Sequence, residues 1–185
     1  MLLLIMLGGT FGNAYSADQE TIRVRIGLKL FRTILAADMH IHEKQDSDGK
    51  LPLAIVYKSN LAVAETYSEK LRHSGKGDHQ GEIKGLPITV DAIAVTQLEQ
   101  LPVGKYAGIY IVETLDSRDL QFLVSYGIAH QRITYSPFDG AVEQGIAAGL
   151  MIAARVTPYV NVQTLKASKL QIKPFFLKVS KRYEP

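Results

Sequence analysis

Hydrophobic and polar positions between Thr21 and Ala37 repeat with the period of an α-helix. Four apolar residues fall on one stripe of that helix: Val24, Leu28, Phe31 and Leu35. Arginine and lysine side chains occupy much of the remaining surface. An apolar face this wide is typical of a helix that packs on a sheet, which we favour over a basic helix that lies on a membrane surface.

Strand and helix patterns alternate through the middle of the chain. Four short segments that are apolar or alternate in polarity predict buried strands, at residues 51–57, 86–95, 107–112 and 132–135. One helix is expected to follow Asn60, which can cap it, and to run to about Arg72. A second is expected to begin after Asp116, with Asp119 in its first turn, and to end at Gly127. This alternation favours parallel strand pairing through right-handed crossovers.

The pattern changes after Ser136. Residues 145–162 are extended and rich in Ala and Val, and they predict one bent strand or an antiparallel pair. Asn161 is expected to cap a helix at residues 162–169, and Pro174 fits the first turn of a last short element. Four apolar residues of that element are expected to seal the core: Phe175, Phe176, Leu177 and Val179. The sequence therefore predicts a single α/β domain with a mixed, largely parallel sheet and helices on both faces.

The stretch Ser136-Pro137-Phe138-Asp139 has the composition of a helix N-terminus. Ser136 would cap the helix, Pro137 would take its first position, and Asp139 at the third would return the capping bond. We therefore interpret Ser136, Asp139 and Asn161 as structural caps rather than as chemically active groups.

The first sixteen residues differ from the rest of the chain. An apolar run at residues 2–7 is followed by Ala14 and Ser16, small side chains placed as a signal peptidase requires before Ala17. The run is too short to span a bilayer. No Lys or Arg precedes it, and a buried N-terminal helix is the alternative. We predict a signal peptide at residues 1–16 and a mature domain at residues 17–185 that is exported to the periplasm.

The amino-acid composition is that of one folded domain, and it argues against a nucleic-acid partner and against thiol chemistry. A hydrophobic fraction of 46% and a charged fraction of 21% are those of an ordinary folded domain, and 185 residues suffice for one substantial core. The net charge of +3 comes from Lys and Arg dispersed along the chain, which argues against a nucleic-acid partner. The absence of cysteine removes thiol nucleophiles and zinc–thiolate sites.

Two histidines, His40 and His42, lie two residues apart and would point to one side of an extended segment. Asp38 or Glu43 could add an oxygen ligand for a metal. The segment follows a helix end, and no distant third histidine is implicated, so we favour two exposed histidines. We predict no metal site and no cofactor.

A hydrolytic triad would need a serine, a histidine and an acid that converge in space. Ser125 and Ser136, together with His130, are the candidates for such a site. None of them lies in a GxSxG elbow, so a hydrolase is the least favoured hypothesis. We predict no catalytic residue and expect that the protein is not an enzyme.

The C-terminal half carries a continuous signature of apolar and capping residues. Its segments are Gly145 to Leu150, Val160-Asn161-Val162, Thr164 to Leu170, and Ile172 to Leu177. In this order they give a glycine-containing strand region, a strand end with a central asparagine, a short helix and an apolar tail. The signature resembles the closing part of the YfiR-like family, and the opening helix with Leu30-Phe31 behind an export signal fits the same family. The resemblance covers residues 21–181.

The resemblance implies a periplasmic protein without enzymatic activity that represses a membrane-bound diguanylate cyclase, or another sensor protein, by binding the sensor part. It also implies that an outer-membrane lipoprotein can sequester such a regulator. Binding would favour one conformation of the sensor and so alter cyclic-di-GMP signalling and biofilm formation. The cysteines of the founding members are absent, so redox sensing is not implied. Whether the protein forms a homodimer stays open.

Such a regulator needs an exposed apolar or aromatic patch. The predicted partner-binding surface is the loop around Tyr135 and Phe138, with Tyr159 nearby. Core packing is the alternative for each aromatic, and we favour it for Tyr159. The rival function is a periplasmic protein that binds a small molecule, because α/β sheets bind ligands at the carboxyl ends of their strands.

Overall fold

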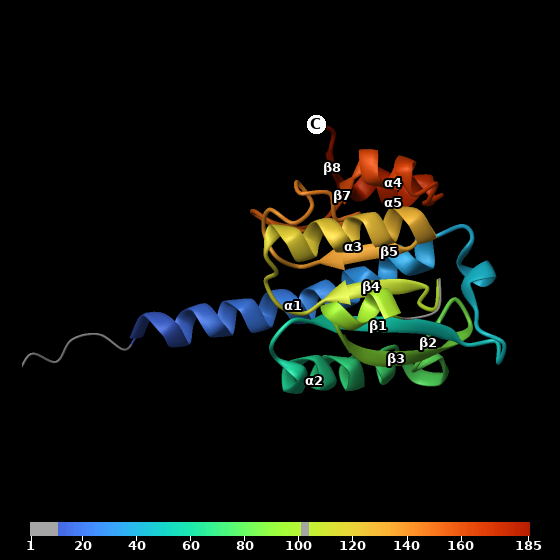
Figure 1. Ribbon diagram of the computed structural model, residues 1–185, viewed down its shortest axis with the longest axis horizontal. Helices are drawn as coiled ribbons and strands as arrows, with labels where there is room; N and C mark the ends of the chain where they lie inside the picture. The colour runs from blue at the N-terminus through green and yellow to red at the C-terminus, as the bar shows by residue number, and fades with distance from the viewer. Residues whose placement is uncertain (1–10, 101–103) are drawn as a thin grey trace, which may run out of the picture.

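An eight-stranded mixed sheet forms the centre of the computed structural model, which describes residues 11–100 and 104–185 (Figure 1). The strand order is β2-β3-β1-β4-β5-β6-β7-β8. Strands β3, β1, β4, β5 and β6 pair in parallel, β2 and β7 run antiparallel to β3 and β6, and β8 is parallel to β7. The strands are β1 Leu51–Tyr57, β2 Glu82–Ile83, β3 Leu86–Ala94, β4 Gly108–Ile111, β5 Ile133–Ser136, β6 Ala148–Ile152, β7 Val156–Asn161 and β8 Lys181–Tyr183.

Helices cover both faces of this sheet, as Figure 1 shows. Helices α1 and α2 pack with Leu53 and Ile55 of β1 on one face, whereas α3 packs with Ala54 and Val56 on the other. This split follows from the alternation of side chains along a strand. The helices are α1 Phe11–Ala37, α2 Leu61–Arg72, α3 Ser117–His130, α4 Val162–Ala167 and α5 Pro174–Val179, with 3-10 helices η1 Ile41–Lys44, η2 Gly77–His79 and η3 Val95–Gln100. The predicted fold class is confirmed.

Aromatic rings fasten α1 to the sheet. The rings of Tyr110 and Tyr135 stack with centroids 5.5 Å apart, and Phe31 tilts against both. The Tyr110 hydroxyl donates to the Val24 carbonyl oxygen over 2.7 Å. Gly27 makes room for this contact, because a Cβ there would lie 2.6 Å from the Tyr110 hydroxyl oxygen. Tyr135 is 1% exposed, so its predicted place on a partner-binding surface is wrong.

Helix α3 does not end at Gly127, as the sequence had suggested, but continues to His130. Gln131 closes the helix in the left-handed conformation, with φ of 56°. Gly127 is needed for close packing instead, since a Cβ there would lie 2.9 Å from Thr134 Cγ2 on β5. A glycine within a helical pattern therefore marked a close approach of the helix to a strand side chain rather than a terminus.

The predicted capping box at Ser136 does not form, because the described chain makes turns from Asp139 to Gly145 instead of a helix. Ser136 is the last residue of β5, and its hydroxyl accepts a 3.3 Å hydrogen bond from the Phe138 N–H. Asp139 reaches across to α1, where its two carboxylate oxygens accept hydrogen bonds of 2.8 and 2.9 Å from Arg23. A bidentate ion pair with a distant arginine has replaced the expected local bond.

The C-terminal segment follows the prediction closely until its last helix. Strands β6 and β7 form the antiparallel pair, and Asn161 Oδ1 accepts a 2.9 Å bond from the Thr164 N–H, which confirms the cap of α4. Pro174 opens α5, and Phe176 is buried. Phe175 and Val179 are 65% and 57% exposed, so they do not seal the core. One side only of a short helix can face the sheet, and Phe176 occupies that side.

The predicted signal peptide lies partly outside the described residues, which begin at residue 11. The proposed cleavage position after Ser16 falls within α1, whose first turns project from the body of the domain in Figure 1. Export and cleavage stay predictions. Across residues 11–100 and 104–185, no helix has the length and hydropathy that crossing a membrane requires.

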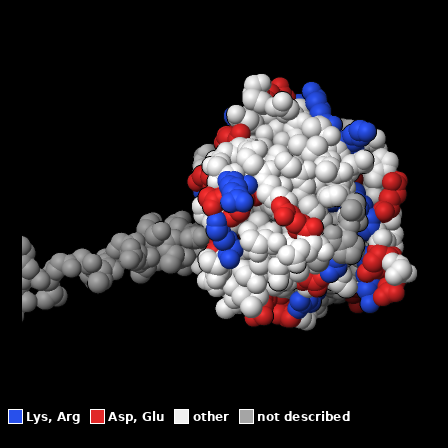
Figure 2. All heavy atoms as spheres, viewed as in Figure 1, with Lys and Arg blue, Asp and Glu red and all other residues white. Residues whose placement is uncertain are grey.

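Charged side chains do not segregate on the face shown in Figure 2. Lys and Arg lie next to Asp and Glu around a broad area of uncharged residues, as the dispersed charges of the sequence suggested.

Candidate functional site

Strands β1 and β4 lie side by side, with Val56 opposite Ile111. From these two strands the chain continues towards opposite edges of the sheet. Strand β1 leads through α2 to β3 on one flank, while β4 leads through α3 to β5 on the other. Because α2 and α3 lie on opposite faces of the sheet, the two loops diverge at the carboxyl ends of these strands. Open α/β sheets bind their ligands at such a topological switch point.

Both loops at this edge end in a helix cap. Asn60 Oδ1 accepts a 3.1 Å bond from the Val63 N–H at the start of α2. Asp116 Oδ1 accepts a 3.0 Å bond from the Asp119 N–H at the start of α3. The caps form because the first amides of a helix have no partner within it. They hold the preceding residues of each loop in place at the switch point.

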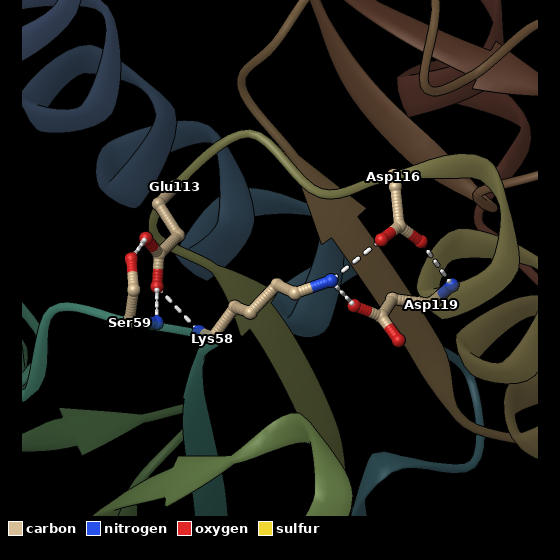
Figure 3. A network of polar contacts seen from close by, with 5 residues as sticks. All are labelled: Lys58, Ser59, Glu113, Asp116 and Asp119. Carbon is tan, nitrogen blue, oxygen red and sulfur yellow. Dashed lines mark hydrogen bonds and ion pairs between the residues drawn. The ribbon is translucent and has the colours of Figure 1, made fainter.

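Glu113 links the two loops, as Figure 3 shows. Its Oε1 accepts from the backbone N–H groups of Lys58, Ser59 and Asn60, at 2.7 Å for Ser59 and 3.3 Å for Asn60. Its Oε2 accepts from the Ser59 hydroxyl at 2.7 Å. One carboxylate from the β4 loop thus organises the whole turn between β1 and α2.

Lys58 makes the second link between the loops. Its Nζ donates to Asp116 Oδ2 at 2.5 Å and to Asp119 Oδ2 at 2.7 Å (Figure 3). The same Asp116 therefore caps α3 with one oxygen and binds the lysine with the other. We call Lys58, Ser59, Glu113, Asp116 and Asp119 the carboxyl-edge network.

The contacts of the carboxyl-edge network keep its groups charged. Partial burial would raise the pKa of Glu113, but the hydrogen bonds from Ser59, Lys58 and Asn60 outweigh burial and lower it. The hydrogen bond from Lys58, and then that from the Asp119 backbone, lower the pKa of Asp116. The bonds to Asp116 and Asp119 raise the pKa of Lys58. At neutral pH Glu113 and Asp116 are therefore carboxylates and Lys58 is an ammonium group.

A pocket of about 320 Å³ opens beside Glu113, between α1, α2 and the end of β4. Its walls are mostly apolar, and Asn60 with Glu113 forms its polar side. The size lies at the small end of ligand sites, which suits a molecule no larger than an amino acid. The lining residues are Thr21, Val24, Asn60, Val63, Tyr67, Val112 and Glu113.

Ser59 is the hydroxyl of the carboxyl-edge network, and Glu113 is its hydrogen-bond partner. The Ser59 hydroxyl donates to a carboxylate, and a serine nucleophile would need an imidazole or amine base beside it. His73 follows the last residue of α2 and His130 ends α3, at the ends of these helices remote from the network. Glu113 Oε2 accepts from Ser59 and retains capacity for a second donor.

The predicted partner-binding aromatics do not form one exposed patch. Tyr135 is buried beneath α1, and Phe138 is partly buried against the same core. Tyr159 is 7% exposed, which agrees with the core packing that we favoured for it. Burial and a hydrogen bond with Glu143 raise the pKa of Tyr159 to about 12.

The other candidate groups are also dispersed. His40 pairs with Glu43 at 2.7 Å, and no cluster of three metal-ligating side chains occurs among the described residues. Ser125 is exposed on α3, whereas the His130 ring packs edge-on against Tyr126. Ser136 is buried at the end of β5. These three residues do not form the arrangement of a hydrolase.

Sequence reasoning assigned no role to Lys58, Ser59 or Glu113. Asp116 and Asp119 were recognised, but only in the cap of α3. The useful signal was the position of polar residues directly after two apolar strand segments, at residues 58–60 and at Glu113. In a parallel sheet such positions meet at the carboxyl edge.

Comparison with known proteins gives similarity in fold and not in sequence. No protein-family model matches the chain, and no curated protein matches it in sequence. An ABC domain from Streptococcus pneumoniae in complex with L-Trp superposes with a TM-score of 0.58 at 11% identity, over 84% of this chain and 61% of that one. An open, ligand-free substrate-binding protein with adhesive properties from Clostridium difficile has a TM-score of 0.53 at 13% identity, over 72% and 54% of the two chains.

A conserved domain protein from Vibrio cholerae gives a TM-score of 0.51 at 12% identity, over 77% of this chain and 57% of that one. The chain thus spans less than two thirds of each of these proteins. Similarity at this level shows a shared α/β fold.

Proposed function

We propose that this chain is a non-catalytic binding protein that takes a small solute at the carboxyl edge of β1 and β4. The observation that carries this proposal is the pocket beside Glu113 at the topological switch point. The fold shared with substrate-binding proteins supports it. The mature domain would act in the periplasm, where its predicted export signal directs it.

Charge and shape together select the solute. The carboxyl-edge network carries three carboxylates against one lysine, so it favours a positively charged group. Val24, Val63 and Val112 offer an apolar wall of limited length. The ligand would therefore carry an amine that donates to Glu113 Oε2 and a short apolar portion that fits against the valines.

The test is isothermal titration calorimetry of the purified protein with a panel of putrescine, L-lysine and the other standard amino acids. We expect at least one member to bind. Val63→Phe would fill the pocket, and Glu113→Gln would remove its charge, so each should weaken binding about tenfold or more. Glu65→Gln removes an exposed carboxylate from α2, the helix that carries Val63, and should leave the affinity for the solute unchanged.

Two outcomes would contradict this site. One is a panel that gives neither heat nor a change in melting temperature. The other is binding that survives Val63→Phe unchanged, because the solute would then lie elsewhere.

A second candidate is the regulator of a membrane-bound diguanylate cyclase, or of another sensor protein, to which the YfiR-like resemblance of residues 21–181 points. The observation in favour of it is an exposed apolar pair on α5. Phe175 and Val179 lie one helical turn apart and are 65% and 57% exposed. Exposed apolar side chains of this kind suit contact with a protein partner. An outer-membrane lipoprotein that sequesters the regulator would compete with the sensor protein for this apolar pair.

Genetics separates the two candidates. Deleting the gene should raise cellular cyclic-di-GMP if the protein represses a cyclase, and complementation with Phe175→Glu/Val179→Glu should fail. Lys178→Glu alters an exposed residue of the same helix and should still complement. Unchanged cyclic-di-GMP after deletion would exclude the cyclase version.

A further inference from the structure

A second depression, of about 860 Å³, lies between α1 and the loop at residues 74–84. Lys29 and Arg32 contribute from α1, while Lys76 and Lys84 contribute from the loop. We call these four residues the cationic groove. It is distinct from the pocket beside Glu113, with which it shares no lining residue.

Arg32 holds the two walls of the cationic groove together. Its guanidinium group donates to the Ser74 hydroxyl at 2.6 Å and to the Glu82 carbonyl oxygen at 2.7 Å. Burial lowers the pKa of Arg32, although arginine remains charged at any physiological pH. These bonds fix the loop against α1, so the groove is formed before any ligand arrives.

The charges of the cationic groove are not balanced by the protein. Within the described chain, none of its four cations forms an ion pair with a carboxylate. Glu82 is the one carboxylate in the lining, and its Oε2 lies 3.5 Å from His79 Nδ1. Four cations against one carboxylate create a positive potential over a concave surface, where field lines concentrate.

A fifth cation adds to this imbalance. Lys173, the residue before α5, is in side-chain contact with Lys84. The close approach of the Lys84 side chain, whose ammonium group can only repel a second one, lowers the pKa of Lys173. Two adjacent lysines repel each other, and an anion placed between them would remove that repulsion.

We propose that the cationic groove binds an organic or inorganic polyanion that carries at least two phosphate or carboxylate groups. The groove is larger than a single phosphate requires, and its cations come from both walls, so a ligand with separated charges engages more of them. Ammonium groups bind phosphate and carboxylate oxygens through charge-assisted hydrogen bonds. The ligand is either a free solute or the headgroup of an anionic lipid.

The test uses the intact protein and two probes that each carry more than one phosphate, inorganic tripolyphosphate and vesicles that contain the diphosphate lipid cardiolipin. At low ionic strength we expect binding to at least one probe, weakened as salt rises. Lys29→Ala/Lys84→Ala should reduce the affinity about tenfold or more, because it removes one cation from each wall. Tripolyphosphate binding would indicate a soluble ligand, and binding to vesicles alone would indicate a lipid headgroup.

A matched variant separates the groove from overall charge. Arg118→Ala/Lys181→Ala also removes two exposed cations, from α3 and β8, and should bind as the wild type does. Circular dichroism and melting temperature should show both variants folded. Equal losses in the two variants, or no binding to either probe, would overturn the proposal. Because the test does not involve Glu113, it can fail without affecting the proposed solute site.

Discussion

Lys58 at the carboxyl edge of the sheet and Lys84 in the cationic groove have opposite surroundings. Lys58 contacts two aspartates that belong to the next loop. Lys84 lies beside another lysine, and no carboxylate of the described chain forms an ion pair with it. In the first region the lysine is paired with carboxylates of the protein, and these bonds fix two loops. In the second region the positive charges outnumber the carboxylates, so an anion from outside the protein would be attracted to the groove.

The two regions differ in how much of their hydrogen-bonding and charge capacity the protein itself uses. The carboxyl-edge network is mainly a structural connection with spare capacity at Glu113 Oε2. The cationic groove has few internal contacts apart from those of Arg32. Stability should therefore respond strongly to changes in the network and weakly to changes in the groove.

The largest effect on stability is expected from Glu113→Ala. The substitution leaves backbone N–H groups of the turn after β1 without their acceptor. We expect the free energy of unfolding to fall by about 2 kcal/mol, the usual range for lost hydrogen bonds to a charged group. Urea denaturation measures this free energy. The control Glu65→Ala, at an exposed residue, should change the free energy of unfolding by less than about 0.5 kcal/mol. Equal effects of the two substitutions would show that the network does not hold the loops.

Acid should weaken the same network. The folded-state pKa of Glu113 lies below its ordinary value of 4.5, so the ionised form stabilises the fold fully above that pH. Stability should fall as the pH drops below 4.5 towards the folded-state pKa, because protonation then removes the bonded carboxylate. Glu113→Gln should flatten this part of the stability profile, measured by denaturation at several pH values. An unchanged slope would assign the acid sensitivity to other groups.

The smallest effect is expected beside the cationic groove, at Lys173. Lys173→Gln removes the repulsion with Lys84 and should raise the melting temperature slightly at low ionic strength. The gain should disappear in concentrated salt, which screens exposed charges. Lys166→Gln on α4 serves as the control for one lost charge. A lower melting temperature for Lys173→Gln would mean that the two lysines do not repel each other in solution.

Local patterns predicted those parts of the fold that depend on neighbouring residues. The apolar run at β1 was placed correctly, and the caps at Asn60 and Asn161 form as expected. Predictions based on a single residue type were less reliable. Gly127 packs against β5, and Asp139 pairs with Arg23, because contacts between distant segments outweighed the local preference.

The candidate site was less predictable for the same reason. Glu113 lies 54 residues from Ser59 in the sequence, so no local spacing connects them. The pairing of β1 with β4 brings them together, and that register emerges only with the complete sheet. The exposure of Phe175 was likewise hidden, since it depends on the direction in which a six-residue helix meets the sheet.

The stacked rings of Tyr110 and Tyr135 also provide a spectroscopic probe. The chain contains no tryptophan, so its intrinsic fluorescence and its near-ultraviolet dichroism come mainly from tyrosine. Both rings lie directly beneath α1, next to Phe31. The chain has nine tyrosines, so the part of a signal change that Tyr110→Phe/Tyr135→Phe abolishes reports whether the first helix is seated on the sheet.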